Sequence, residues 1–153
     1  MLLARDVIAA LAAAGQTVSV AESLTGGLLC ARLTSVPGAS AVVLGGVVAY
    51  DTGIKHSVLG VDEQVLRAHG AVSETTAAAM AEASRGVFDS TWAVATTGVA
   101  GPTEQEGKPV GTVFVAVSGP RQAVTGLHLS GDREGIRQQT CAVALELLHN
   151  CLE

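Results

Sequence analysis

The feature that most constrains the fold is the alternation of short apolar runs with helical stretches. Residues 41–50 and 92–97 are almost continuously apolar, which is typical of strands buried on both faces of a sheet. Residues 17–21 form a third run, in which β-branched residues alternate with small ones, as in a short strand. Helical patterns separate these runs. This order predicts helices on both faces of a sheet, which is an α/β fold.

The remaining elements follow from periodicity and from capping residues. Residues 111–117 and 123–129 are two further β-like runs joined by Gly119-Pro120, which predicts a hairpin. Helices are expected over residues 2–14, 28–33, 62–67, 74–86 and from residue 133 onward. The last helix is expected to bury the stripe Ile136, Thr140, Val143, Leu147 and Cys151. We therefore expect a three-layer α/β/α fold with a mixed, mostly parallel sheet and a C-terminal hairpin plus helix.

Size and composition limit the class of protein. A chain of 153 residues fits one domain, residues 1–153. A hydrophobic content of 48% against 15% charged residues excludes a disordered chain. A net charge of −5 and only four aromatic residues (3%) argue against nucleic-acid binding.

The cysteines and the apolar runs indicate where such a chain works. The chain has three cysteines, which is an odd number and too few for a disulfide framework. This favours a reducing compartment. No apolar run approaches the ~18 residues of a membrane span. We expect a cytoplasmic protein without a membrane partner, and its sequence leaves assembly into a homo-oligomer open.

Several standard sites are absent from the sequence. It contains no G-x-G-x-x-G, G-x-S-x-G or S-x-x-K motif. The four histidines are scattered without zinc spacing and read as surface or helix-end residues. Neither a metal site nor a dinucleotide site is expected.

Ser23 is the first candidate functional residue. It follows a predicted strand and precedes Thr25, Gly26 and Gly27. Ligands bind at the carboxyl ends of such strands, where the amides of a helix start can hold an anion or an oxyanion. The alternative is structural, since Ser23 or Thr25 would serve equally well as a helix N-cap.

Tyr50 and Lys55 form the second candidate. Tyr50 is the only tyrosine and ends an apolar run, and Lys55 is one of two lysines. A lysine in a partly apolar cleft has a lowered pKa and acts as a general base, so Ser23 with Lys55 would make a nucleophile pair without histidine. The alternative is a surface lysine that precedes a helix.

Two further segments complete the candidate site. Thr97, Gly98 and Gly101 follow the strand over residues 92–97, again at a strand end. Arg133 begins the last helix, and a guanidinium binds oxyanions with two parallel hydrogen bonds. Alternatively, Asp132 caps that helix and Arg133 is solvated.

Seven motifs together resemble one known family. They occur in this order: Ala21-Glu-Ser-Leu-Thr-Gly-Gly27, Tyr50-x4-Lys55, Leu59-Gly-Val61, His69-Gly-Ala-Val-Ser-Glu74, Thr97-Gly-Val-Ala-Gly-Pro102, Lys108-Pro-Val-Gly-Thr112 and Ser130-Gly-Asp-Arg133. Each is weak alone, but their register over residues 5–150 is similar to the C-terminal domain of the competence/damage-inducible protein CinA, the nicotinamide-nucleotide amidase family.

The resemblance implies a cofactor-free amidase of pyridine nucleotide salvage, in a stand-alone form without the pyrophosphatase domain. It would convert nicotinamide mononucleotide to nicotinate mononucleotide and ammonia. Ser23 matches the family's nucleophile, and Lys55 and Tyr50 match its activating residues. Arg133 matches a phosphate-binding position, and residues 97–102 match a loop that lines the pocket. Amides near Thr25, Gly26 and Gly27 are expected to receive the oxyanion.

Two departures from the family pattern bear on this assignment. Residues 103–107 are shorter than the family's glycine-rich loop, and Asp51-Thr52 stand where Ser-Asn is frequent. The competing hypotheses are a non-catalytic nucleotide-binding or regulatory module and an oligomerisation domain. The distance between Ser23 and Lys55 discriminates between the enzyme and the binding module.

Overall fold

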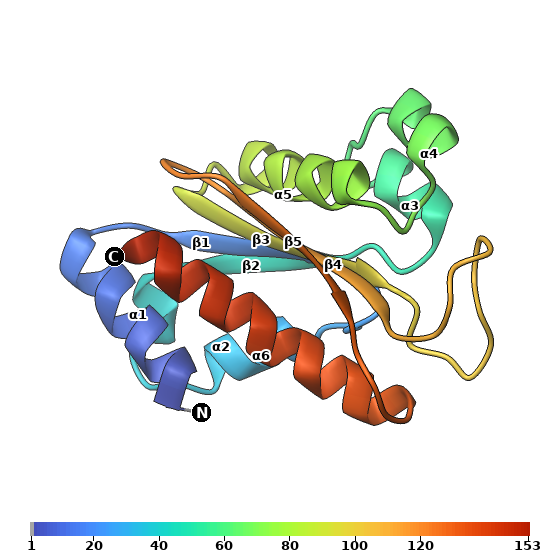
Figure 1. Cartoon of the computed structure of the whole chain (residues 1–153). Helices are drawn as coiled ribbons and strands as arrows, with labels where there is room; N and C mark the ends of the chain where they lie inside the picture. Colours follow the sequence, from blue (N-terminus) through green and yellow to red (C-terminus); the bar gives the residue numbers. More distant parts are fainter. Residues whose placement is uncertain (1) are drawn as a thin grey trace.

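Five strands form one sheet in the computed structural model, which describes residues 2–153 (Figure 1). The strands are β1 (Val18–Glu22), β2 (Val43–Val48), β3 (Trp92–Gly98), β4 (Thr112–Ser118) and β5 (Ala123–His128), in the spatial order β2-β1-β3-β4-β5. β1 pairs in parallel with β2 and β3, while β4 is antiparallel to β3 and β5. The predicted mixed sheet with a late hairpin is confirmed.

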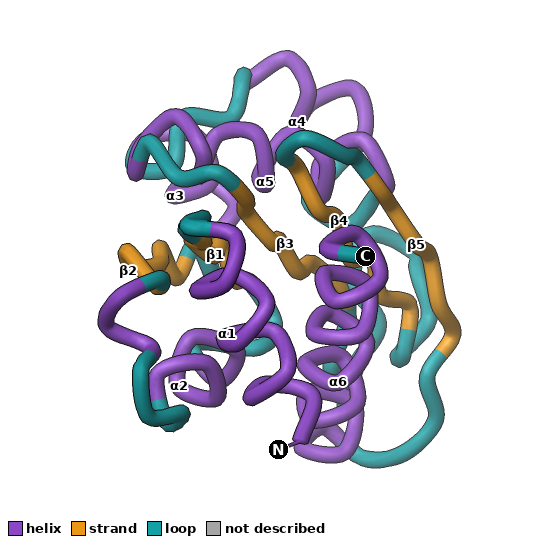
Figure 2. Tube along the Cα trace, turned by 90° about the vertical axis from the view of Figure 1, so that its left-hand side faces the viewer, coloured by secondary structure: helices purple, strands orange, loops and turns teal. Residues whose placement is uncertain are grey.

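Helices cover both faces of this sheet. They are α1 (Leu2–Ala14), α2 (Leu28–Thr34), α3 (Thr52–Ser57), α4 (Glu63–His69), α5 (Glu74–Phe88) and α6 (Arg133–Leu152). α1, α2 and α6 lie on one face, and α3, α4 and α5 on the other (Figures 1 and 2). The three-layer α/β/α architecture is therefore confirmed.

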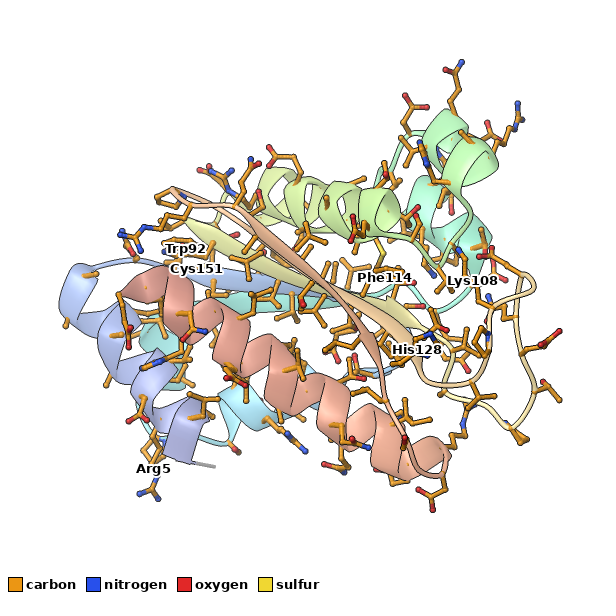
Figure 3. All side chains as sticks on the ribbon, in the orientation of Figure 1. Arg5, Trp92, Lys108, Phe114, His128 and Cys151 are labelled. Carbon is orange, nitrogen blue, oxygen red and sulfur yellow. The ribbon has the colours of Figure 1, made fainter. Side chains whose placement is uncertain are left out.

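The two helical layers pack differently because the two faces of the sheet differ in side-chain size. Under α1, α2 and α6 the sheet presents valines such as Val20, Val94 and Val115, which share one core with leucines of these helices. On the opposite face the sheet presents small side chains, and alanines of α5 pack close to it. Trp92 starts β3 at the end of the sheet far from Lys108 (Figure 3), where its indole nitrogen donates to Gln16.

β2 corrects one expectation. Residues 41–50 were expected to be buried on both faces, but β2 occupies an edge of the sheet and its residues alternate between half-buried and exposed. Leu44 and Val48 are 47% and 49% exposed. A short 3₁₀ turn (Ala39–Ala41) precedes the strand. An apolar run shows that a segment avoids water on average, and does not give its place in the strand order.

The buried stripe of α6 is also wider than expected. Ile136 and Thr140 are buried as predicted, whereas Val143, Leu147 and Cys151 are only half-buried. The residues buried instead are Cys141, Ala144, Leu145 and Leu148. The cause is that α6 packs against the sheet and α1 together, so its apolar face is broader than one stripe.

α3 is absent from the sequence-based expectation. It has six residues and contains Gly53, so neither its length nor its propensity predicts a helix. Asp51 stabilises its start by accepting a hydrogen bond from the Gly53 amide at 2.9 Å. This short helix places Lys55 beneath the end of β1.

Candidate active site

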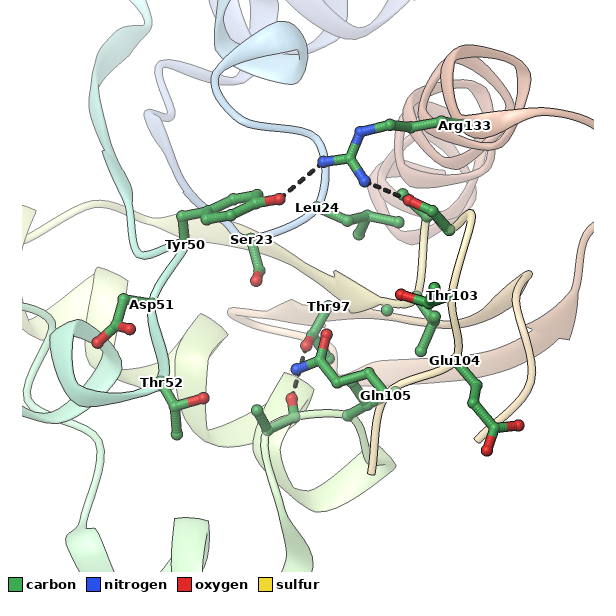
Figure 4. Close-up of a pocket in the computed structure, with 16 residues that line it drawn as sticks. Ser23, Leu24, Tyr50, Asp51, Thr52, Thr97, Thr103, Glu104, Gln105 and Arg133 are labelled. Carbon is green, nitrogen blue, oxygen red and sulfur yellow. Dashed lines mark hydrogen bonds between the residues drawn. The ribbon is translucent and has the colours of Figure 1, made fainter. Parts of the chain in front are cut away.

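A cavity of about 410 Å³ opens at the carboxyl ends of β1 and β3 (Figure 4). Its wall is built by five segments: the turn after β1, the connection from β2 to α3, Ala71 and Val72 before α5, residues 97–105, and the start of α6. The strand ends meet there because β1 and β3 are parallel neighbours. This is the place at which open α/β sheets bind ligands.

Ser23 stands at the end of β1, on the wall of this cavity. Its amide donates to the Thr96 carbonyl at 3.0 Å, which extends the pairing of β1 with β3 by one residue. α2 begins only at Leu28, with Gly27 as its N-cap, and the Thr25 hydroxyl contacts Thr96 instead of an amide of α2. The alternative of Ser23 or Thr25 as the helix cap is therefore wrong.

The start of α2 is held instead by Glu22, which sequence analysis did not single out. Its buried carboxylate accepts hydrogen bonds from the amides of Gly27, Leu29 and Cys30 at 3.3, 2.9 and 2.9 Å. Three amides at a helix N-terminus satisfy a buried negative charge. Because Glu22 accepts the hydrogen bonds of these amides, the hydroxyl of Ser23 is free to make other contacts.

Lys55 makes that contact. Its side chain is 1% exposed, and Nζ lies 3.0 Å from Ser23 Oγ. Nζ also donates to the carbonyls of Ala49 and Tyr50 at 2.8 and 3.2 Å. The alternative of a surface lysine is wrong. Burial lowers the pKa of Lys55 from 10.5 to about 8, although the negative charges of Asp51 and Glu106 act against this shift.

An ammonium donates to all three of these oxygens, and the same positions also accommodate a neutral amine. A neutral amine has two N–H donors and one lone pair, whereas an ammonium has three donors and no acceptor. With the two donors on the carbonyls of Ala49 and Tyr50, the lone pair faces the hydroxyl of Ser23. In this state Ser23 donates and Lys55 accepts, which is the arrangement that activates a serine.

Tyr50 and Arg133 face one another at the mouth of the cavity (Figure 4). Arg133 Nη2 donates to the Tyr50 hydroxyl at 2.7 Å, and Nη1 donates to the Gly101 carbonyl at 2.5 Å. Asp132 does cap α6, accepting from the Gly135 amide at 2.8 Å. The capping part of the alternative is therefore confirmed. Arg133 is an exposed residue on the cavity lining, and its binding of an oxyanion stays a prediction.

The position of Tyr50 corrects the expectation that its phenol activates Ser23. Tyr50 is 57% exposed, and among the described residues its hydroxyl is bonded only to Arg133. The part of Tyr50 that contacts Lys55 is the main-chain carbonyl.

Thr97, Gly98 and Gly101 all lie on the cavity wall. The buried hydroxyl of Thr97 donates to the Ala71 carbonyl at 2.6 Å, which ties the end of β3 to the segment before α5. Gly98 is required by space, since a Cβ there would lie 2.7 Å from the Thr112 carbonyl oxygen.

Thr25, Gly26 and Gly27 lie outside the cavity wall, which corrects the expectation for them. The Gly26 amide donates to the Ser23 carbonyl at 3.0 Å, and that of Gly27 donates to Glu22. Thr25 is fully buried, with its hydroxyl 2.8 Å from that of Thr96. The amides of Gly26 and Gly27 are thus already occupied and are not available to an oxyanion.

The loop that departs from the family pattern is fastened by a residue that sequence analysis missed. The Glu106 carboxylate accepts from the amides of Ala71 and Val72 at 2.9 and 3.0 Å. Lys108 donates to the Val72 carbonyl next to it. No local pattern marks Glu106, because its partners lie far away in the sequence. Its bonds hold residues 103–105 in the cavity wall.

Other kinds of site find little support in the described structure. Residues 2–153 contain no cluster of three histidine, cysteine or acidic side chains that would bind a metal. Cys30, Cys141 and Cys151 are free thiols. No helix in the described part of the chain combines the length and apolar character needed to cross a membrane.

Fold and site together define a class of protein: a three-layer α/β domain with a buried serine–lysine pair at the carboxyl edge of its sheet. The model of the CinA C-terminal domain matches residues 2–152. The chain belongs to this family.

Curated relatives agree with this assignment. The chain is 54% identical over 137 residues to a CinA-like protein of Frankia casuarinae, covering 89% of this chain and 32% of the relative. A CinA-like protein of Anaeromyxobacter sp. (strain Fw109-5) is 52% identical over 149 residues, covering 95% and 36%. The chain thus spans about a third of the length of these relatives.

Solved structures resemble the chain over nearly its whole length. The CinA superfamily protein KP700603 from Klebsiella pneumoniae 700603 has a TM-score of 0.95 at 33% identity, with 99% of this chain and 96% of that chain covered. The competence/damage inducible protein CihA from Agrobacterium tumefaciens has a TM-score of 0.90 at 39% identity, with 99% and 93% covered.

Proposed function

We propose that this domain hydrolyses nicotinamide mononucleotide to nicotinate mononucleotide and ammonia, with Ser23 as nucleophile and Lys55 as base. The observation that carries the proposal is the 3.0 Å contact between Ser23 Oγ and the buried Lys55 Nζ. A binding module has no use for a lysine of lowered pKa beneath a serine. Perturbed pKa values of this kind concentrate at catalytic sites.

The reaction proceeds in two halves. Lys55 takes the Ser23 proton while Oγ bonds to the carboxamide carbon, and the carbonyl oxygen becomes an oxyanion. The C–N bond then breaks, and the Lys55 ammonium returns the proton to the leaving nitrogen, which departs as ammonia. The product of this half is an ester of Ser23. Water attacks the ester carbon, Lys55 takes its proton, and the C–O bond breaks to release the carboxylate and reprotonate Ser23.

The oxyanion requires an N–H donor other than Gly26 or Gly27. We assign this role to the Leu24 amide, which directly follows Ser23 and has no acceptor among residues 2–153. Leu24 also lines the cavity. Backbone donors of this kind are fixed before the charge develops, so they need no reorganisation during the reaction.

The size and charge of the cavity support a nucleotide. Its volume of about 410 Å³ is within the usual range for small ligands, roughly 300–1,000 Å³. Arg133 supplies a guanidinium at the mouth, where it would pair with a phosphate while the amide reaches Ser23. The Tyr50 ring beside it presents an apolar face for a flat base.

The test is release of ammonia and nicotinate mononucleotide from nicotinamide mononucleotide by the purified chain. Ser23→Ala and Lys55→Met are both expected to lose activity by at least about 10³-fold, because residues that act as one unit fail together. Met keeps the length of the lysine stem and removes only the amine. A wild type that binds the nucleotide but releases no ammonia would support the binding-module alternative. Turnover by Ser23→Ala at the wild-type rate would refute the mechanism.

A further inference from the structure

Two arginines one helical turn apart on α6 reach different parts of the site. Arg133 points to the mouth of the cavity, where it contacts Tyr50 and Gly101. Arg137 points instead to the turn behind Ser23. Its Nε donates to the Leu24 carbonyl and its Nη2 to the Thr25 carbonyl, both at 3.0 Å. Its Nη1 pairs with the exposed carboxylate of Glu134 at 2.6 Å.

Arg137 adds to the bonds that hold this turn from its two sides, where Glu22 accepts from the Gly27 amide and the Thr25 hydroxyl contacts that of Thr96. Gly26 and Gly27 both have positive φ values, 58° and 105°, and glycine there leaves the backbone free to adopt other conformations. Within the turn, the Gly26 amide bonds to the Ser23 carbonyl and the Leu28 amide to the Thr25 carbonyl. The guanidinium of Arg137 also packs against Gly26, since a Cβ at Gly26 would lie 3.3 Å from its Nη2.

A guanidinium suits this place better than an ammonium. Its donors form a rigid planar fork, so two neighbouring carbonyls are fixed in one relative orientation. The amide and the carbonyl of Leu24 lie on either side of the same Cα. Fixing the carbonyl therefore also limits the orientations that the Leu24 amide can adopt. Leu24 is 3% exposed, follows the nucleophile Ser23 directly, and itself carries the carbonyl that Arg137 binds.

We propose that Arg137 is a positioning residue, which holds the turn after Ser23 so that Oγ remains on Lys55 Nζ and the Leu24 amide remains on the cavity wall. This inference rests on the proposed amidase function. Arg137 itself touches main-chain carbonyls of the turn and does not line the cavity. Its effect is therefore on the geometry of the reacting groups, where a misplacement of about 1 Å lowers the rate by roughly 10²-fold.

The kinetic constants separate Arg137 from its neighbour on the helix. Arg137→Ala is expected to lower kcat by roughly 10²-fold with KM changed less than about threefold, since nucleotide contacts are intact. Arg133→Ala is expected to do the reverse, raising KM with a small effect on kcat. Glu134→Gln is the matched control: it removes the ion pair with Arg137 and leaves both carbonyl bonds, so its kinetics should equal those of the wild type.

Chemical rescue tests whether the lost group acts through its position. Guanidinium chloride at millimolar, non-denaturing concentration should raise the kcat of Arg137→Ala at least tenfold. It should leave Ser23→Ala inactive. Arg137→Lys, with one donor atom in place of the fork, should retain part of the rate. The proposal would be overturned if Arg137→Ala had the kcat of the wild type, or if guanidinium did not raise its lowered kcat.

Amide hydrogen exchange separates this proposal from the proposed function. In Arg137→Ala the amides of Gly26 and Leu28, which bond within the turn, should exchange at least tenfold faster than in the wild type. The Leu148 amide, in the core of α6, is the control and should not change. Unchanged exchange at Gly26 overturns the anchoring role. If the wild type has no amidase activity but Arg137→Ala still shows this faster exchange, only the proposed function is refuted and the anchoring role stands.

Discussion

The pH dependence of the reaction is the sharpest consequence of the site, because only neutral Lys55 accepts the Ser23 proton. With a pKa of about 8, the neutral fraction is about 10% at pH 7, about half at pH 8 and about 90% at pH 9. The value of kcat/KM should therefore rise roughly tenfold between pH 7 and 9 and then level off. A lysine of ordinary pKa predicts instead a tenfold rise for each pH unit up to about pH 10.

The charges around Lys55 give the profile a second test. Asp51 and Glu106 both raise the pKa of Lys55, in opposition to burial. Asp51→Asn removes one of these charges but keeps the side-chain oxygen that caps α3. The midpoint of the profile should move to lower pH in this variant, which makes it faster than the wild type at pH 7 and equal to it at pH 9.

The assay is the initial rate of nicotinate mononucleotide formation, followed by chromatography from pH 7 to 10 at nucleotide concentrations well below KM. Points below pH 7 are omitted because the substrate phosphate itself titrates with a pKa near 6. Glu63→Gln, an exposed charge change on α4, is the control and should leave the midpoint in place. A rate that is independent of pH between 7 and 9, or one still rising tenfold per unit at pH 10, would refute neutral Lys55 as the base.

Three further predictions concern single contacts. Arg133→Ala should raise KM for the nucleotide roughly 10- to 100-fold, the loss expected for a charge-assisted phosphate contact, and an unchanged KM in steady-state kinetics would exclude that contact. Gly98→Ala should destabilise the fold by about 1–3 kcal/mol in urea unfolding, because its Cβ meets the Thr112 carbonyl; Gly86→Ala, in α5 with open space, should be neutral or stabilising. Glu22→Gln should lower the free energy of unfolding by about 1–3 kcal/mol in the same experiment, since its NH₂ group would face backbone N–H donors that now bond to the carboxylate. An unchanged unfolding midpoint would count against the capping role of Glu22.

Local sequence was sufficient for elements whose pattern is long or strongly periodic. β3, β4, β5 and the start of α6 were predicted within about one residue, because apolar runs and the Asp132 cap mark them directly. The edge position of β2 was missed because strand order depends on pairing between distant segments. α3 was missed because six residues with a glycine carry no helical signal.

The same division holds for the site. Ser23 and Arg133 stand at an element end that their own neighbours indicate, so residue type and position were enough to select them. The occupied amides of Gly26 and Gly27 were not predictable, since the first follows from the bond of the turn to the Ser23 carbonyl and the second from the inward position of Glu22. Arg137 had a usable signal, because it lies one turn beyond Arg133 and so on the same face of the helix. Glu106 had none.

The site brings together positions that lie far apart along the chain, which has a consequence for how the protein folds. Ser23 meets Lys55 across 32 residues, its amide meets Thr96 across 73, and Tyr50 meets Arg133 across 83. Closing such long loops is slow, and the entropy is lost before the contacts form. No fragment that lacks Ser23 or Arg133 contains a complete site, so in a refolding experiment activity should return only after all of these site contacts have formed.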